Sequence, residues 1–191
     1  MKHLFLVPVV LSLLFPGAVV SDELPLVEEA KLQPVQVTLR RLVQATDYIG
    51  SPLQGDRAEL FSSDLSGIQK QLDPLCIAAV TINPESRVSA TPGDGERILV
   101  HGEWSCFLVK IVNEAGVTAP LRVLSEEDAI VADWFVDRPM QERLAGIPLE
   151  YRLLLLRPGE PGKVASILTF DIGQGTQDLG FRSDLLLNFD V

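Results

Sequence analysis

Cys106-Phe107-Leu108-Val109-Lys110-Ile111-Val112 is the stretch that decides the fold. Phe107, Val109 and Ile111 are alternate residues and all apolar, and this period of two is typical of a β-strand with one face in a core. Lys110 belongs to the opposite face, which the alternation predicts to be exposed. The stretch therefore predicts a core strand with one buried and one solvated face.

Short apolar runs separated by turn residues continue on both sides of this strand. They are residues 76–82, 87–90, 97–100, 121–123, 149–156, 164–171 and 185–189. Pro92-Gly93-Asp94-Gly95 and Asn113-Glu114-Ala115-Gly116 are typical of the turns between them. Several short strands at this spacing predict a mainly β protein with an Ig-like antiparallel β-sandwich.

Residues 59–72 are the best candidate for an α-helix. Apolar residues recur there at spacings of three and four, namely Leu60, Phe61, Leu65, Ile68 and Leu72. Asp56 is a plausible N-cap, and Asp73-Pro74 ends the helix because proline disfavours helical geometry in the residue before it. The expected fold is a sandwich with one packed α-helix.

The segments around these elements complete the predicted organisation. Val35-Gln36-Val37-Thr38-Leu39 alternates and is β-branched, which predicts a strand. Residues 22–34 are acidic and contain two prolines, which indicates a flexible N-terminal arm. Residues 125–147 interrupt the strands, and we expect Trp134 and Phe135 to pack back onto the core. Residues 35–191 are therefore predicted to form a single β-sandwich domain.

Residues 1–21 have the pattern of a secretory signal peptide. Lys2 supplies the basic start, a charge-free apolar run follows, and small residues lead to Ser21. The run is shorter than the roughly 20 residues of a membrane-spanning helix, and two prolines interrupt it. We expect cleavage after Ser21 and a secreted or periplasmic protein with no membrane contact afterwards.

The chain is strongly acidic, with 26 acidic and 16 basic residues and a formal net charge of −10. Nucleic acids and anionic lipid surfaces attract basic proteins. The charge therefore argues against both as partners and favours a well-solvated surface.

Cys76 and Cys106 raise the question of a disulfide, which would suit an exported protein. The alternation of residues 76–82 puts Cys76 on the apolar face of its strand, whereas Cys106 shares the other face of its own strand with Lys110. If the two sulfur atoms point to different sides of the sheet, they cannot form a disulfide. The sequence alone leaves this question open.

No residue pattern predicts a catalytic, cofactor or metal site. His101 is the sole histidine after signal cleavage, and its position beside Gly102 favours a surface or hydrogen-bonded role over that of a zinc ligand. There is no G-x-S-x-G motif, and no spacing matches His101 to a serine nucleophile. Glu126-Glu127-Asp128 lacks the alternating ligands of a calcium loop, and Gly173-Gln174-Gly175 lacks the lysine or third glycine of a phosphate loop.

Aromatic residues offer one candidate for a binding surface. Trp104 and Trp134, with Phe107 and Phe135, could line a carbohydrate platform, although the closeness of Trp104 to the core strand favours packing. Carboxylate pairs of a glycosidase are the weakest candidate, because 26 acidic residues always offer such pairs.

Five stretches together resemble a known class of protein. They are IGSPLQGDR (49–57), LDPLC (72–76), VTINPESRV (80–88), FLVKIVNEAGVTAPL (107–121) and GQGTQDLGFR (173–182). They resemble the N-terminal β-rich region of large secreted planctomycete-type proteins in which a CehA/McbA-type metallohydrolase domain follows. That family's metal ligands belong to the downstream domain, so the resemblance implies an accessory Ig-like role without catalytic residues here.

The expected function is an exported, non-catalytic β-sandwich accessory or interaction module. A carbohydrate- or polymer-binding module is the alternative, and a carboxylate-only hydrolase comes third. The last strand has apolar residues on both faces, with Leu185, Leu187 and Phe189 on one of them. Such a strand needs cover, so we expect a protein partner or self-association through it.

Overall fold

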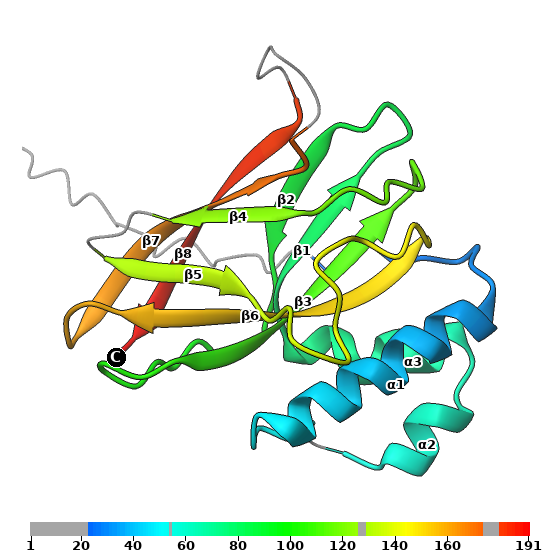
Figure 1. Ribbon diagram of the computed structural model, residues 1–191, viewed down its shortest axis with the longest axis horizontal. Coiled ribbons are helices and arrows are strands. Elements are labelled where there is room, and N and C mark those ends of the chain that lie inside the picture. Colours follow the sequence, from blue (N-terminus) through cyan, green and yellow to red (C-terminus); the bar gives the residue numbers. More distant parts are fainter. Residues whose placement is uncertain (1–22, 54, 126–128, 174–179) are drawn as a thin grey trace, which may run out of the picture.

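The computed structural model describes residues 23–53, 55–125, 129–173 and 180–191, which form a helical layer and two β-sheets (Figure 1). The helices are α1 (Leu32–Tyr48), α2 (Arg57–Ser62) and α3 (Leu65–Leu72), and a 3-10 turn, η1 (Asp73–Leu75), follows α3. The strands are β1 (Cys76–Ile82), β2 (Val88–Pro92), β3 (Ser105–Asn113), β4 (Arg122–Ser125), β5 (Ile130–Trp134), β6 (Leu149–Pro158), β7 (Lys163–Asp171) and β8 (Arg182–Asp190). The signal peptide predicted for residues 1–21 lies outside the described residues, as do residues 126–128 and 174–175 of the two loops discussed above.

The strands form one sheet in the order β2-β1-β3-β6-β5 and a second in the order β4-β7-β8. The prediction of a mainly β protein, a β-sandwich with a packed helix, is confirmed. One pair differs from the antiparallel expectation, because β1 and β3 run parallel. The chain leaves the β1–β2 hairpin and crosses to the far side of β1 before it enters β3.

The crossing segment, residues 93–104, passes very close to the start of β1. A Cβ atom on Gly93 would overlap the carbonyl oxygen of Cys76, and one on Gly95 would overlap that of Leu75. Only glycine fits such an approach between backbones. Gly93 and Gly95 are therefore required by the crossing.

The edges of the two sheets lie against each other at both sides of the sandwich. β4 meets β5, where Ser125 Oγ accepts a hydrogen bond from Ala132 N at 3.1 Å. β2 meets β8, where Ser183 Oγ accepts one from Ala90 N at 3.0 Å. These contacts cover strand edges that would otherwise be open to pairing with another chain.

The first core lies between the two sheets. Phe107, Val109 and Ile111 all face it, as the alternation in β3 predicts. From the opposite sheet, β8 contributes Leu185, Leu187 and Phe189. The rings of Phe107 and Phe189 meet edge to face with their centroids 6.0 Å apart, a favourable arrangement for two aromatic rings.

A second core lies between the helices and the outer face of the five-stranded sheet, where α1 packs along β6 (Figure 1). Val35, Leu39, Leu42 and Val43 are buried along one side of α1. The strand predicted for residues 35–39 is therefore wrong. Those five residues alone fit a period of two, but the apolar positions continue past Leu39 at spacings of three and four, which is the helical period.

The helix predicted for residues 59–72 is divided into α2 and α3. The Asp56 carboxylate caps α2 by accepting hydrogen bonds from Ala58 N and Glu59 N, as predicted. The extended backbone of Ser63 then breaks the helix, and the Asp64 carboxylate caps α3 by accepting from Gly67 N. A second N-cap residue inside the apolar pattern is the local signal for this break.

The predicted N-terminal arm also differs in the structure. α1 begins at Leu32, inside the range assigned to the arm. Leu24 and Val27 are buried in the core beneath the helices. We call residues 23–30 the strap, because this segment has neither helix nor strand yet lies along α3.

Candidate functional site

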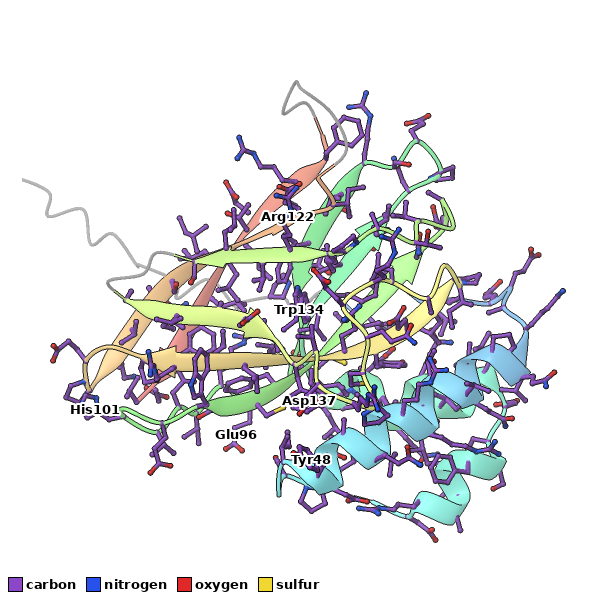
Figure 2. The ribbon with its side chains drawn as sticks, in the orientation of Figure 1. Tyr48, Glu96, His101, Arg122, Trp134 and Asp137 are labelled. Atoms are coloured by element: carbon purple, nitrogen blue, oxygen red, sulfur yellow. The ribbon has the colours of Figure 1, made fainter. Side chains whose placement is uncertain are left out.

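The four aromatic residues of the predicted platform do not assemble into one surface. Trp134 is buried between the sheets and packs against Phe170, with ring centroids 6.0 Å apart (Figure 2). Phe107 faces the same core, whereas Phe135 lies in the core beneath the helices. The expected packing of Trp134 and Phe135 is confirmed, and these side chains cannot form an exposed row.

Trp104 departs from the packing expected for it, because 47% of the residue is exposed. It precedes β3 on the face that the helices cover further along the sheet. The guanidinium of Arg157 lies 5.0 Å from the centroid of its ring, a cation–π distance. This contact gives the exposed indole a partner at the surface.

Two further apolar side chains are exposed on the same crossing segment. Ile98 is 56% exposed and Val100 is 52% exposed, whereas Leu99 between them is buried. Ile98 forms an isolated bridge with Asp190, which places the segment beside the end of β8 and the C-terminus (Figure 1). We define the C-terminal patch as Ile98, Val100, Trp104 and Arg157.

The C-terminal patch is held in a fixed shape by hydrogen bonds around it. Leu99 N donates to Asp190 O at 2.8 Å, and Asp190 N donates to Arg97 O at 3.0 Å. Val100 N donates to Ser105 Oγ at 3.3 Å. His101 occupies the exposed turn at the tip of the segment (Figure 2). An apolar surface presented on a fixed backbone suits docking to another protein.

A buried polar cluster lies between the helices and the five-stranded sheet, and its central residue corrects a prediction. Lys110 was expected to be exposed, but its side chain is wholly buried beneath the helices. Lys110 Nζ lies 2.6 Å from Asp73 Oδ2 and donates to Gln69 Oε1 at 3.0 Å. Tyr151 donates its hydroxyl to Asp73 Oδ1 at 2.7 Å. The alternation in β3 assigns Lys110 to the correct face of the sheet, but it carries no information about the helices that cover this face.

The geometry of this cluster joins the helices to the sheet. Lys110 and Tyr151 are directly opposite each other on β3 and β6, and Asp73 follows α3. Both carboxylate oxygens of Asp73 already accept hydrogen bonds from these two side chains. Burial, followed by the nearby Asp73 carboxylate, raises the pKa of Tyr151, so its hydroxyl keeps the proton that it donates. We assign the cluster a structural role.

Both cysteines are free thiols. The side assigned to Cys76 is wrong, because a register shift between Cys76 and Ala78 turns Cys76 toward the helices, where Cys106 also lies. Cys76 pairs with Leu108, two residues beyond Cys106. That offset separates their Cα atoms by roughly 8 Å, beyond the reach of a disulfide.

A second buried ion pair, between Glu150 and Arg152, binds the loop between β5 and β6. Arg152 Nη1 lies 3.7 Å from Glu150 Oε1, and both side chains are buried. Glu150 Oε2 accepts from Ala145 N at 2.8 Å, and Arg152 donates to the carbonyl of Gln141. Burial raises the pKa of Glu150 and lowers that of Arg152, because it disfavours both charges. The two residues hold the loop over one end of the sandwich.

Within the part of the chain that the structure describes, no three His, Cys, Asp or Glu side chains converge as metal ligands. None of the described helices has the length and apolar character needed to cross a membrane. No family model and no curated protein matches the chain. A solved structure of a cysteine protease inhibitor from Entamoeba histolytica is similar over 59% of this chain and 93% of that chain, with 8% identity and a TM-score of 0.30.

Proposed function

We propose that the protein is an exported, non-catalytic interaction module and that the C-terminal patch is its docking surface for another protein chain. The observation that carries the proposal is the exposure of three apolar side chains, Ile98, Val100 and Trp104, within seven residues of the crossing segment. Tryptophan and arginine are enriched where proteins bind one another, and the patch offers both.

Two sequence features support this proposal. The pattern of residues 1–21 supports export. The resemblance to the N-terminal β-rich region of planctomycete-type CehA/McbA proteins supports an accessory role beside another protein domain. The sequence predicts a docking site at the last strand, and we propose a related site close to it. Because β2 covers one side of β8, we place the contact on the side chains beside the end of β8 instead of on its backbone edge.

Site-specific photo-crosslinking in the native host tests the proposal. A photoreactive amino acid at Val100 should give a discrete adduct with another protein. The same group at Glu85, an exposed residue of the β1–β2 turn at the opposite end of β3 from Trp104, is the matched control and should give none. Ile98→Asp should abolish the adduct from position 100. Equal adducts from both positions, or an adduct indifferent to Ile98→Asp, would contradict the proposal.

A carbohydrate- or polymer-binding module is the second candidate, and the exposure of Trp104 favours it. Sugars stack on exposed aromatic rings, and Arg157 could add hydrogen bonds beside the ring. Affinity electrophoresis through gels that contain xylan, chitin or cellulose derivatives tests this function. Retardation that Trp104→Ala removes would support it, and migration equal to that in a gel without polysaccharide would exclude these polymers.

A further inference from the structure

The two sheets of the sandwich differ in what lies against their outer faces. The helices pack on the five-stranded sheet, whereas the three-stranded sheet β4-β7-β8 lies on the side of the sandwich away from them (Figure 1). Alternate residues of β7 from Lys163 to Asp171 and of β8 from Arg182 to Asp190 point outward, because the buried residues of both strands alternate with them. We call these outward side chains the open face.

The open face is apolar at its middle. Ile167 and Leu186 are directly opposite each other on β7 and β8, and they are 38% and 60% exposed. Leu124 of β4 is diagonal to Ile167 and 52% exposed. Side chains at such positions are neighbours on the surface of a sheet. Three aliphatic side chains therefore form one exposed apolar group, a feature typical of a protein contact.

The ends of the open face carry charges of opposite sign. β7 has Lys163 as its first residue and Asp171 as its last, and β8 has Arg182 as its first and Asp190 as its last. The exposed aliphatic residue of each strand lies four residues from either end. Each of the two strands thus has a positive start, an apolar centre and a negative end.

This pattern makes the open face complementary to a copy of itself. A half-turn about an axis that lies in the face, perpendicular to the strands, stacks each strand on its own counterpart in the reverse direction. The central aliphatic residues then meet their own counterparts. Arg182 meets Asp190 of the second copy, and Lys163 meets Asp171 of the second copy. Apolar side chains therefore lie on apolar ones, and opposite charges face each other.

The charges of the open face are able to exchange partners in this way. Within one copy, Lys163 Nζ lies 3.8 Å from Asp190 Oδ1, and these side chains are 91% and 70% exposed. Ion pairs with so much exposure contribute little to stability and form no fixed geometry. Pairing across a contact between two copies therefore disrupts no strong interaction.

The shape of the open face agrees with the same half-turn. A hollow of 330 Å³ lies towards one end of the face, where its lining includes Ala165 and Asn188. At the corresponding position on the other side of the axis, Thr169 donates its hydroxyl to Asp184 Oδ1 at 2.6 Å. The half-turn brings Thr169 and Asp184 of the second copy over the hollow. The amide of Asn188 then faces a carboxylate to which it can donate.

We propose that the open face is a contact between two copies of this chain, which form a two-fold dimer with β7 and β8 of each copy stacked antiparallel on the same strands of the other. Twisted sheets pack face to face in this way, about 10 Å apart and at an angle of about 30°. This inference does not depend on the C-terminal patch.

The size and charge of the contact make the dimer weak. Two nine-residue strands and a short third strand present on the order of 400 Å² on each copy, which is at the low end for specific contacts. The net charge of −10 on each chain also opposes association. We therefore expect a dissociation constant of about 100 µM. At the much lower concentrations used for unfolding measurements, the chain is monomeric.

Sedimentation equilibrium on the described protein and two variants tests the apolar centre. Leu186→Asp should weaken dimerisation at least about tenfold, because it places two carboxylates at the axis. Leu26→Asp is the matched control, since Leu26 is also 60% exposed but lies in the strap. It should dimerise as the wild type does. A wild type that remains monomeric at about 500 µM would overturn the proposal, since that is well above the dissociation constant expected for this contact.

A mixing experiment tests the charge pattern. Arg182→Glu alone and Asp190→Lys alone should each remain monomeric, because each homodimer places two like-charged pairs in the contact. An equimolar mixture of the two variants should dimerise at least about tenfold more tightly than either variant alone, because Glu at position 182 of one chain meets Lys at position 190 of the other. Any disturbance within one chain persists in the mixture, so recovery there comes from contacts between chains.

Two results would exclude this arrangement. A mixture that associates no better than its separate components would show that positions 182 and 190 do not meet across a dimer. Dimerisation that survives Leu186→Asp but is lost in Ile98→Asp would place the contact at the C-terminal patch and overturn the proposal.

Discussion

Lys110 shows what a single residue within a strand pattern can and cannot reveal. The alternation of β3 correctly separates it from Phe107, Val109 and Ile111. Whether the face of β3 that carries Lys110 is exposed to solvent depends on α3 and η1, which lie more than 30 residues earlier in the chain. A lone lysine in an otherwise apolar strand fits a solvated face and a buried ion pair equally well. The partner that distinguishes them, Asp73, cannot be found by local periodicity.

Lys110→Met should destabilise the protein by about 2–4 kcal/mol, because it leaves the carboxylate of Asp73 in a largely buried position without its cation. Lys163→Met is the matched control, since Lys163 is 91% exposed in its ion pair with Asp190. The control should stay within about 0.5 kcal/mol of wild type. Urea denaturation measures both. Equal midpoints for the two variants would show that Lys110 is solvated after all.

The two thiols give a second prediction at the scale of the residue. Burial raises the pKa of Cys106 to about 12 and also raises that of Cys76. The thiolate is the reactive form, so both thiols should react very slowly with Ellman's reagent at pH 8 in the native state. The rate for Cys106 should rise with pH up to its pKa, as long as the fold persists. Denaturation without reductant should release two reactive thiols, and none would reveal a disulfide.

At the scale of elements, the inter-sheet strands could be predicted and the helices only partly so. β8 follows its sequence pattern closely, with Leu185, Leu187 and Phe189 buried and Leu186 exposed. α1 was missed because its first residues are β-branched and alternate, so the helical spacing emerges only over the full 17 residues. The register shift at the start of β1 could not be predicted either, because it arises in the pairing with β3 and lies where residues 93–95 approach the backbone, and both are contacts between distant segments.

Adjacent leucines in β8 provide a matched test of its register. Leu187→Ala should cost about 2–5 kcal/mol, because Leu187 is 1% exposed in the inter-sheet core and its truncation leaves a cavity. Leu186→Ala should change stability by less than about 0.5 kcal/mol, because that side chain is 60% exposed. Thermal and urea unfolding measure the difference. A costly Leu186→Ala in the isolated protein would place Leu186 in an interface between copies of the chain.

At the scale of the whole molecule, the sequence predicts a two-sheet sandwich but not the layer that completes it. Local alternation identifies residues that face a core, so the core between the sheets could be predicted. The outer face of the five-stranded sheet is also largely apolar, through side chains such as Leu108, Val112 and Leu153. A strand buried on both faces must lie between two layers, so β3 and β6 required a cover. The candidate docking surface could not be predicted, because the exposure of Trp104 depends on where the helices end.

The position of the Lys110 cluster between layers leads to a prediction for the whole molecule. The cluster, formed by Lys110, Asp73 and Tyr151, joins the helical layer to the sheet. The helices and the sandwich should therefore unfold in one cooperative step. Far-UV circular dichroism follows the helices, and tryptophan fluorescence, from Trp134 between the sheets and Trp104 just before β3, follows the sandwich. The two urea transitions of the wild type should coincide. Asp73→Asn should separate them, with helical signal lost at lower urea, because the ion pair that couples the layers is gone. Separate transitions already in the wild type would show that the layers are independent and that the cluster does not join them.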